Sequence, residues 1–290
     1  MHAMRSVVAG VTFGIASALA AGSAIAIDNS AIGKPEFRKH VATYGLVYRL
    51  PGEVNSVLDA KINGPLHERL LKLGLVAESK TFNLPHVTVV HIHSADPATP
   101  RKMLGALSTV QPVLNVTLKD FYTTEASKGA GAPWWLDLGI VKTGQGFEDM
   151  MAYNTVATAA LTPLRDGPLP RCTGPVFANM SDGARELTRT VGVSGVNVMK
   201  NGKEVRSHNP HNTLVYSMSG FDPAMQAAMK QVADEFNTIL PQGIPTTFKD
   251  ISIVEIGFSG NVLREFYRIS LENGQAWDVA TGKAVPFGKK

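Results

Sequence analysis

The spacing of apolar residues along this chain switches repeatedly between the two-residue period of strands and the three-to-four-residue period of helices. Short runs that are rich in β-branched and aromatic residues predict strands. These runs cover residues 41–50, 86–92, 113–122, 134–140, 211–218, 251–258 and 264–271. Apolar residues at helical spacing predict helices between them. These stretches cover residues 54–75, 101–110, 146–161 and 224–240.

Two of the predicted helices carry local signals of where a helix begins or breaks. Gly64-Pro65 stands in the middle of the first stretch, so we expect two helical pieces with a break between them. Asp222-Pro223 precedes the last stretch, as a helix N-cap followed by a proline at the first helical position. The last helix is therefore expected to begin at this proline.

Three stretches lack a clear period. Residues 27–40 predict an extended arm, and residues 274–290 predict a short surface tail. Between 162 and 206 the chain is rich in proline and glycine, with one short helical piece near 182–190. A stretch of this length is long for a connection within a compact domain, so we expect a lid or a substrate loop there.

One tetrapeptide occurs twice in the chain, as Pro85-His86-Val87-Thr88 and as Pro210-His211-Asn212-Thr213. Each copy leads into an apolar run on a predicted strand, and each motif strand is followed by a turn and then a helix. This arrangement indicates an internal pseudo-repeat, with two half-sites that face each other across a cleft.

The repeated unit suits acid–base chemistry. Residues i and i+2 of a strand point to the same face, so His86 projects with Thr88, and His211 projects with Thr213. A histidine gives or takes a proton near neutral pH, and a threonine hydroxyl donates to an anionic oxygen. One such histidine is more often structural than catalytic, but two in equivalent contexts indicate one shared phosphate site that needs no metal.

Other residues offer alternative or additional chemistry. His91 and His93 form an H-x-H pair that can bind zinc. Strand alternation points them away from His86, so we expect polar residues on an outer face instead. Trp135 of the Trp134-Trp135 pair can stack a base, although one tryptophan in the core and one at an edge is the simpler interpretation. Candidate substrate contacts are Trp135, Tyr216 and, for a phosphate, Arg206.

Composition limits the classes of function. Of 290 residues, 44% are hydrophobic and 18% are charged, which is typical of a globular chain. The formal charge of +4 is compatible with an anionic substrate but too small for a long nucleic-acid footprint. Cys172 is the only cysteine, so the chain has no intramolecular disulfide and no thiolate metal site, and we do not expect a catalytic thiol.

The first 26 residues resemble a secretory signal peptide. Arg5 supplies a positive start, residues 7–21 are apolar and small, and Ala24-Ile25-Ala26 has the small-x-small form of a cleavage site. We expect a mature chain that begins near Ile27 and is exported to the periplasm or secreted, without stable membrane association. An uncleaved N-terminal anchor is the alternative.

With these motifs, the chain resembles the two-histidine (2H) phosphoesterase superfamily, which includes bacterial RNA 2',3'-cyclic phosphodiesterases, also called 2'-5' RNA ligases. The motifs that carry the resemblance are His86-Val87-Thr88-Val89 and His211-Asn212-Thr213-Leu214. The strand at 135–139 and the closing hairpin at 256–267 are also similar, so the resemblance covers residues 41–271. The long stretch between the motifs and the predicted export depart from the usual family pattern.

The resemblance implies an α+β fold, with two pseudo-symmetric lobes of antiparallel sheet, outer helices and an active-site cleft between the lobes. This bilobal domain would span residues 41–273, with an insertion at about 162–206. It implies a phosphodiesterase that uses His86 and His211 as acid and base, with Thr88 and Thr213 on the phosphate oxygens. No cofactor, metal or protein partner is implied, and the expected partner is a nucleotide or RNA end that carries a cyclic phosphate or a 2'-5' linkage.

Two other classes of function remain open. The same His-x-Thr pairs would let a non-catalytic module hold a nucleotide or phosphate without turning it over. A zinc hydrolase built on His91 and His93 is the third class. The sequence does not distinguish hydrolysis from ligation, and it does not say which histidine is the base.

Overall fold

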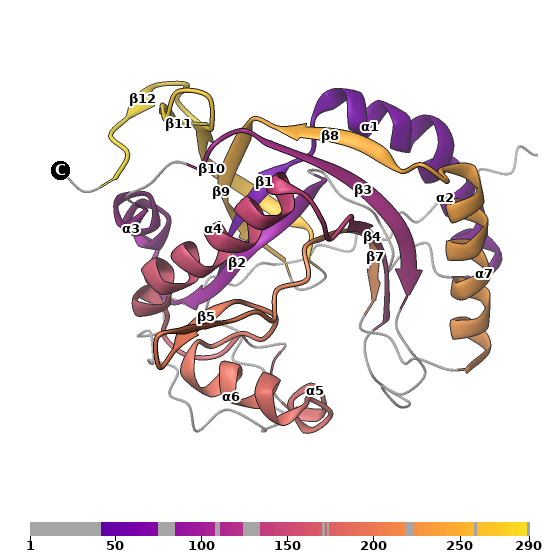
Figure 1. Ribbon diagram of the computed structural model, residues 1–290, viewed down its shortest axis with the longest axis horizontal. Coiled ribbons are helices and arrows are strands. Elements are labelled where there is room, and N and C mark those ends of the chain that lie inside the picture. The colour runs from indigo at the N-terminus through magenta and orange to yellow at the C-terminus, as the bar shows by residue number, and fades with distance from the viewer. Residues whose placement is uncertain are drawn as a thin grey trace, which may run out of the picture.

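In the computed structural model, strands of the described chain pair into one long antiparallel sheet, and helices pack against it (Figure 1). The structure describes residues 42–74, 85–107, 111–123, 134–169, 172, 174–217, 223–257 and 260–288. The predicted signal peptide and N-terminal arm lie outside these residues. The α+β prediction is confirmed.

Ten strands of the described chain make this sheet, in the order β12-β11-β10-β9-β1-β2-β7-β4-β3-β8. Their bounds are β1 (Ala42–Arg49), β2 (His86–Ser94), β3 (Leu114–Thr123), β4 (Trp134–Ile140), β7 (His211–Ser217), β8 (Ile244–Phe248), β9 (Asp250–Ile256), β10 (Val262–Ser270), β11 (Ala276–Asp278) and β12 (Ala284–Val285). A separate hairpin consists of β5 (Val198–Lys200) and β6 (Lys203–Val205).

The helices lie singly or in runs between these strands along the chain. Their bounds are α1 (Gly52–Leu58), a π-helical turn η2 (Asp59–Asn63), α2 (Gly64–Lys72), α3 (Thr99–Ala106), α4 (Gln145–Leu161), a 3₁₀ turn η4 (Thr162–Leu164), α5 (Gly174–Ala178), α6 (Asp182–Thr190) and α7 (Pro223–Ile239). Within the described residues, no helix is both long enough and apolar enough to cross a membrane.

The two motif strands meet in the middle of the sheet. β2 ends one half (β12-β11-β10-β9-β1-β2), and β7 begins the other (β7-β4-β3-β8). In the described chain these strands share one paired position, where Val87 faces Asn212. The side-chain Oδ1 of Asn212 also accepts a hydrogen bond from the backbone N–H of His86, at 3.2 Å. This narrow seam holds the two His-x-Thr units next to each other.

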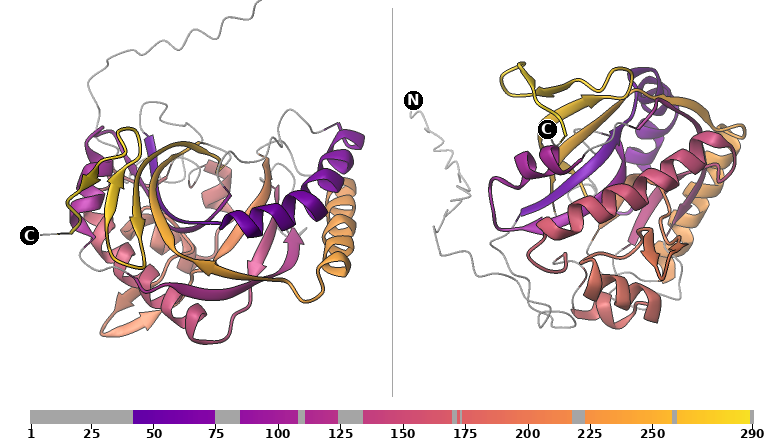
Figure 2. Two further views of the ribbon diagram at one scale, coloured as in Figure 1. Left: turned by 90° about the horizontal axis from the view of Figure 1, so that it is seen from above. Right: turned by 60° about the vertical axis from the view of Figure 1, so that its left-hand side comes forward.

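One hydrophobic core serves both halves of the sheet. α4 packs across β2 in the first half and β3 in the second, and Figure 2 shows it lying along the sheet. Phe147, Met150, Ala157 and Leu161 are buried at helical spacing along α4, which explains why this stretch forms a helix that faces the sheet. The predicted lobes are therefore two halves of one sheet that share a core.

Both motif strands contain the same irregularity. In β2 the pairing with β1 skips Val89, because Thr88 faces Val47 whereas Val90 faces Leu46. In β7 the pairing with β4 skips Leu214, because Thr213 faces Asp137 whereas Val215 faces Leu136. Each skipped residue is a β-bulge at the position after the motif threonine. The internal repeat thus extends beyond the tetrapeptide to the local backbone.

The predicted break at Gly64-Pro65 is wrong. α1, η2 and α2 form one continuous helical stretch, and the irregular turn lies just before the proline. A proline ring clashes with the carbonyl four residues earlier in a regular α-helix. The wider π-helical turn at Asp59–Asn63 changes the geometry at that carbonyl, so the helix continues with Pro65 in the first turn of α2.

The predictions for the irregular stretches need correction as well. The stretch 162–206 is not a plain loop, because it contains η4, α5, α6 and the β5–β6 hairpin. The tail does not merely lie on the surface, since β11 and β12 extend the sheet beyond β10. β8 was not predicted, and it pairs with β3 at the other edge of the sheet.

Candidate active site

Side chains from both motifs line one cleft of about 360 Å³. His86 and Thr88 come from β2, and His211 and Thr213 come from β7. The structure thus brings together the four residues that the repeated tetrapeptide predicted. A volume of this size is within the range of small-molecule sites.

The first motif contributes a third polar residue that was predicted to face elsewhere. His91 lines the same cleft, and its Nε2 lies 3.3 Å from the Thr88 hydroxyl. The bulge at Val89 shifts the alternation by one position, so His91 shares a face with His86 and Thr88. Across from it, Gly45 leaves room for the ring, because a Cβ at Gly45 would lie 3.3 Å from Cδ2 of His91. The prediction of an outward His91 is wrong.

The two histidines of the H-x-H pair have different surroundings, because His91 lines the cleft and His93 is buried. His93 is 1% exposed, and burial lowers its pKa to about 4. Among the described residues, no three His, Cys, Asp or Glu side chains are grouped so that they could hold a metal ion.

The second motif holds His211 between two oxygen atoms. Its Nδ1 lies 2.7 Å from the backbone carbonyl of Asn209, so this nitrogen carries the proton and donates it. Its Nε2 lies 3.6 Å from Oδ2 of Asp137 and is the nitrogen left to work on a substrate. The His211 side chain is 37% exposed, which leaves it accessible from the cleft.

The sequence analysis did not include Asp137 in the site. It is 2% exposed in the middle of β4, and its Oδ1 has no hydrogen-bond partner among the described residues. Burial raises the pKa of this carboxyl to about 6, against the opposing effects of the His211 charge and of a hydrogen bond from the Thr213 hydroxyl. A charged residue inside the apolar run at 134–140 is itself unusual, and that signal could have identified it.

An aromatic pair forms one end of the cleft. The rings of Trp135 and Tyr216 lie 6.4 Å apart between centroids, with 11° between their planes. Both are candidate substrate contacts, and both line the cleft. Trp134, by contrast, is 1% exposed and belongs to the core. One tryptophan therefore fills the core and the other faces the cleft.

The long insertion supplies another wall. Cys172, Ser194 and Gly195 line the cleft, together with His208 just before the second motif. Nδ1 of His208 lies 3.2 Å from the Gly195 carbonyl oxygen, and burial lowers the pKa of this ring to about 4. His208 is therefore neutral near pH 7.

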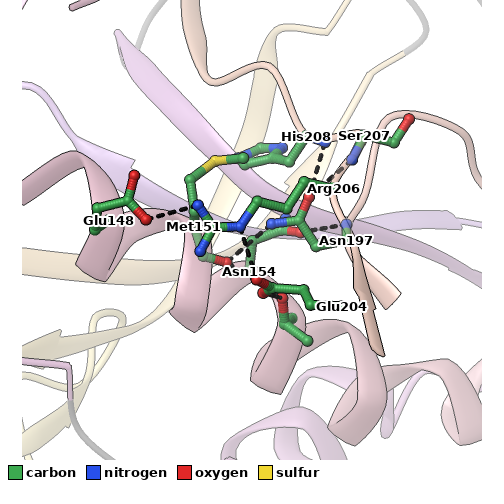
Figure 3. Close-up of polar contacts among 9 residues, drawn as sticks. Glu148, Met151, Asn154, Asn197, Glu204, Arg206, Ser207 and His208 are labelled. Carbon is green, nitrogen blue, oxygen red and sulfur yellow. Dashed lines mark hydrogen bonds and ion pairs between the residues drawn. The ribbon is translucent and has the colours of Figure 1, made fainter. Parts of the chain in front are cut away.

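Two buried amides fix this wall to the rest of the site (Figure 3). Oδ1 of Asn197 accepts hydrogen bonds from the backbone N–H groups of Ser207 and His208, both at 3.0 Å. The backbone N–H of Asn197 in turn donates to Oδ1 of Asn154 on α4. Nδ2 of Asn154 donates to the carbonyl of Val89, the bulged residue of the first motif strand. These amides link the insertion to the first motif strand and to the segment that leads into the second.

Arg206 is not placed as a substrate contact. It lies in a separate groove, and its guanidinium is already used by two carboxylates (Figure 3). Nη1 lies 2.6 Å from Oε2 of Glu148, and Nε lies 2.7 Å from Oε2 of Glu204. The prediction that Arg206 holds a phosphate in the cleft therefore needs correction.

The fold and the cleft define an α+β protein with two histidine–threonine pairs around one small site. No protein-family model and no curated protein matches the chain. Two solved structures are similar. Usb1 of Kluyveromyces marxianus is 13% identical, over 81% of this chain and 98% of that chain, with a TM-score of 0.35.

The second structure is LigT of E. coli in its apo form. It is 14% identical, over 80% of this chain and 99% of that chain, with a TM-score of 0.39. Both TM-scores are below 0.5, so neither similarity says anything about the function of this chain.

Proposed function

We propose that this chain is a phosphodiesterase that opens a 2',3'-cyclic phosphate or cleaves a 2'-5' linkage at the end of a nucleotide or RNA. The observation that supports it is the meeting of His86, Thr88, His211 and Thr213 in one cleft. Two imidazoles supply a base and an acid, and two hydroxyls supply donors for the phosphate oxygens.

The reaction needs one proton at each end of the phosphorus centre. One histidine takes a proton from water, and the water oxygen bonds to phosphorus. The bond from phosphorus to the leaving ribose oxygen breaks, and the other histidine gives that oxygen its proton. Thr88 and Thr213 donate hydrogen bonds to the non-bridging oxygens, where charge builds in the transition state. In the free protein the Thr213 hydroxyl donates to Asp137, so it would have to turn toward the phosphate to fill this role.

The aromatic end of the cleft favours a nucleoside over another alcohol. Trp135 and Tyr216 present ring faces on which a base can stack, and such stacking contributes about 1–3 kcal/mol per base. The signal-like first 26 residues support export, so we place the substrate outside the cytoplasm.

Hydrolysis in the presence of EDTA tests the proposal. The substrates are nucleoside 2',3'-cyclic monophosphates and a short 2'-5'-linked oligonucleotide. His86→Ala and His211→Ala should each lose about 10²–10⁴-fold in rate, because each removes one proton-transfer group. His67→Ala is the matched control, since His67 is exposed on α2 away from the cleft.

Each outcome has a distinct meaning. Turnover that survives EDTA and collapses in both cleft variants supports the two-histidine reaction. Near-normal turnover in both cleft variants refutes it. Histidine-dependent binding of the cyclic phosphate without turnover would replace it with the non-catalytic binding module.

A further inference from the structure

The internal repeat allows the surroundings of the two histidines to be compared position by position. Thr88 is paired with Val47 on β1, and Thr213 is paired with Asp137 on β4. Side chains at paired positions share a face of the sheet. Val47 is fully buried in a small apolar cluster, whereas Asp137 brings a carboxylate to the equivalent position. The two half-sites are therefore alike in backbone and different in charge.

The second motif histidine has an acidic neighbour across its strand pair. The residue paired with His86 is Arg49, whose guanidinium lies 3.4 Å from Glu265 on β10. His211 is paired with Gly139, which carries no charge, and its Nε2 faces Asp137. A neighbouring anion favours an imidazolium.

Two other titratable groups near the Asp137–His211 pair, Tyr122 and His208, add no charge beside it. Tyr122 on β3 faces Asp137, and burial together with the Asp137 charge raises the pKa of its phenol, so it stays neutral. His208, from the segment before β7, has a pKa lowered to about 4 and is neutral as well. On the first-motif side of the cleft lies His91, which contacts Thr88.

Asp137 needs a partner charge when it is ionised. A buried carboxylate loses its hydration, and one oxygen of Asp137 has no hydrogen-bond partner among the described residues. The Thr213 hydroxyl donates to it in the free protein. Once Thr213 turns to the substrate phosphate, the His211 ring is the charged neighbour that remains. Substrate binding therefore strengthens the pairing between Asp137 and protonated His211.

We propose that Asp137 is a positioning residue that shares one proton with His211, which makes His211 the general acid and His86 the general base. This inference rests on the proposed function. The proton on Nε2 of His211 moves to the leaving oxygen as the bond to phosphorus breaks, and His86 takes a proton from the attacking water. His86 then releases its proton to solvent, and His211 takes one up, so the cycle balances.

The first test needs no substrate. Asp137→Asn keeps the shape of the side chain and removes its charge, and NMR follows the titration of the His211 ring in the free protein. The variant lacks the carboxylate 3.6 Å from Nε2, so its midpoint should lie at lower pH than that of the wild type. An unchanged midpoint overturns the inference.

The matched control makes the same chemical change elsewhere. Asp234→Asn removes an exposed carboxylate on α7, where its partner is Lys230. This variant should keep the wild-type titration midpoint of His211. A midpoint that falls equally in both variants overturns the inference, because net charge and not the pair would then be responsible.

The second test assigns the roles by turnover of uridine 2',3'-cyclic monophosphate across the pH range. In Asp137→Asn the alkaline limb of the rate profile should move to lower pH, because the acid loses its proton earlier, while the acid limb stays. Movement of the acid limb alone overturns the assignment. If wild-type protein turns over none of the phosphodiesters, the proposed function and the acid assignment fail, and the ring titration still decides whether the proton is shared.

Discussion

Acid should destabilise this protein through two histidines, the buried His93 and the partly buried His208. Burial lowers the pKa of each ring from 6.5 to about 4. A histidine with a depressed pKa contributes stability that is fully present above pH 6.5 and is lost as the pH falls toward 4. The reason is that in this pH range the ring is protonated in the unfolded chain but stays neutral in the folded chain. Each ring therefore contributes about 3 kcal/mol that acid removes.

The buried carboxyl of Asp137 has the opposite effect on stability in acid. Asp137 has a pKa raised from 3.8 to about 6, so its carboxyl is protonated at a higher pH in the folded chain than in the unfolded chain. As the pH falls through that interval, this carboxyl raises the free energy of unfolding by about 3 kcal/mol. The two histidines and this carboxyl together should lower the free energy of unfolding by about 3–4 kcal/mol between pH 7 and pH 4. That is a large part of the 5–15 kcal/mol that is typical of a folded protein.

Urea unfolding followed by tryptophan fluorescence, repeated at steps from about pH 7 to pH 4.5, measures this loss. His93→Gln removes one of the two histidine titrations, so its stability should fall less steeply, by about 1.4 kcal/mol per pH unit. His67→Gln, at an exposed position, should follow the wild-type slope. If the slopes of His93→Gln and wild type coincide, the reasoning from burial is refuted.

Three further predictions concern the amide links, the packing of helices and the leader. Asn197→Ala leaves two backbone N–H groups without their acceptor and should lower the free energy of unfolding by about 2–4 kcal/mol, measured in urea, with a parallel loss of turnover. Gly146→Ala would place a Cβ on the carbonyl oxygen of Asn115 and should lower the melting temperature by several degrees. Gly183→Ala, in open space on α6, should raise it slightly. N-terminal sequencing of exported protein should begin near Ile27, and an intact leader on purified protein would favour the uncleaved anchor.

The elements that follow one period over many residues could be predicted from the sequence. α4 and α7 lie within a residue or two of the predicted ranges, because their apolar spacing and their start signals are local. β8 was missed because it is short and contains Pro245, which is unusual within a strand. Its place at the edge of the sheet explains why the proline is tolerated. The β5–β6 hairpin was missed even though Asn201-Gly202 is a strong turn signal.

The site was predictable where it depends on neighbours in sequence. The two His-x-Thr units could be found because each is contained in one strand. Asp137 joins His211 only through the pairing of β4 with β7, which strand period alone does not reveal. Arg206 stands near the second motif in sequence, but Glu148 on α4 holds it elsewhere.

The error over His91 came from a bulge. Val89-Val90 and Leu214-Val215 are apolar doublets that interrupt the alternation right after each motif threonine. In each doublet both residues are buried, which requires an extra residue in the strand. A doublet after a His-x-Thr unit therefore signals that the residue five positions after the histidine returns to the catalytic face.

The narrow seam between β2 and β7 sets the distance between the two histidines. Elements that are added elsewhere in the chain do not change this distance. Each histidine lies next to the paired position of Val87 and Asn212 in the described chain. The other strands of the sheet lie outward from this position on either side. New strands at the rims, such as β11 and β12, leave the histidine-to-histidine distance alone. The same holds for the insertion at 162–206, which builds a wall of the cleft without entering the sheet. A chain built this way can acquire a new substrate by lengthening its periphery while the proton-transfer geometry is inherited unchanged.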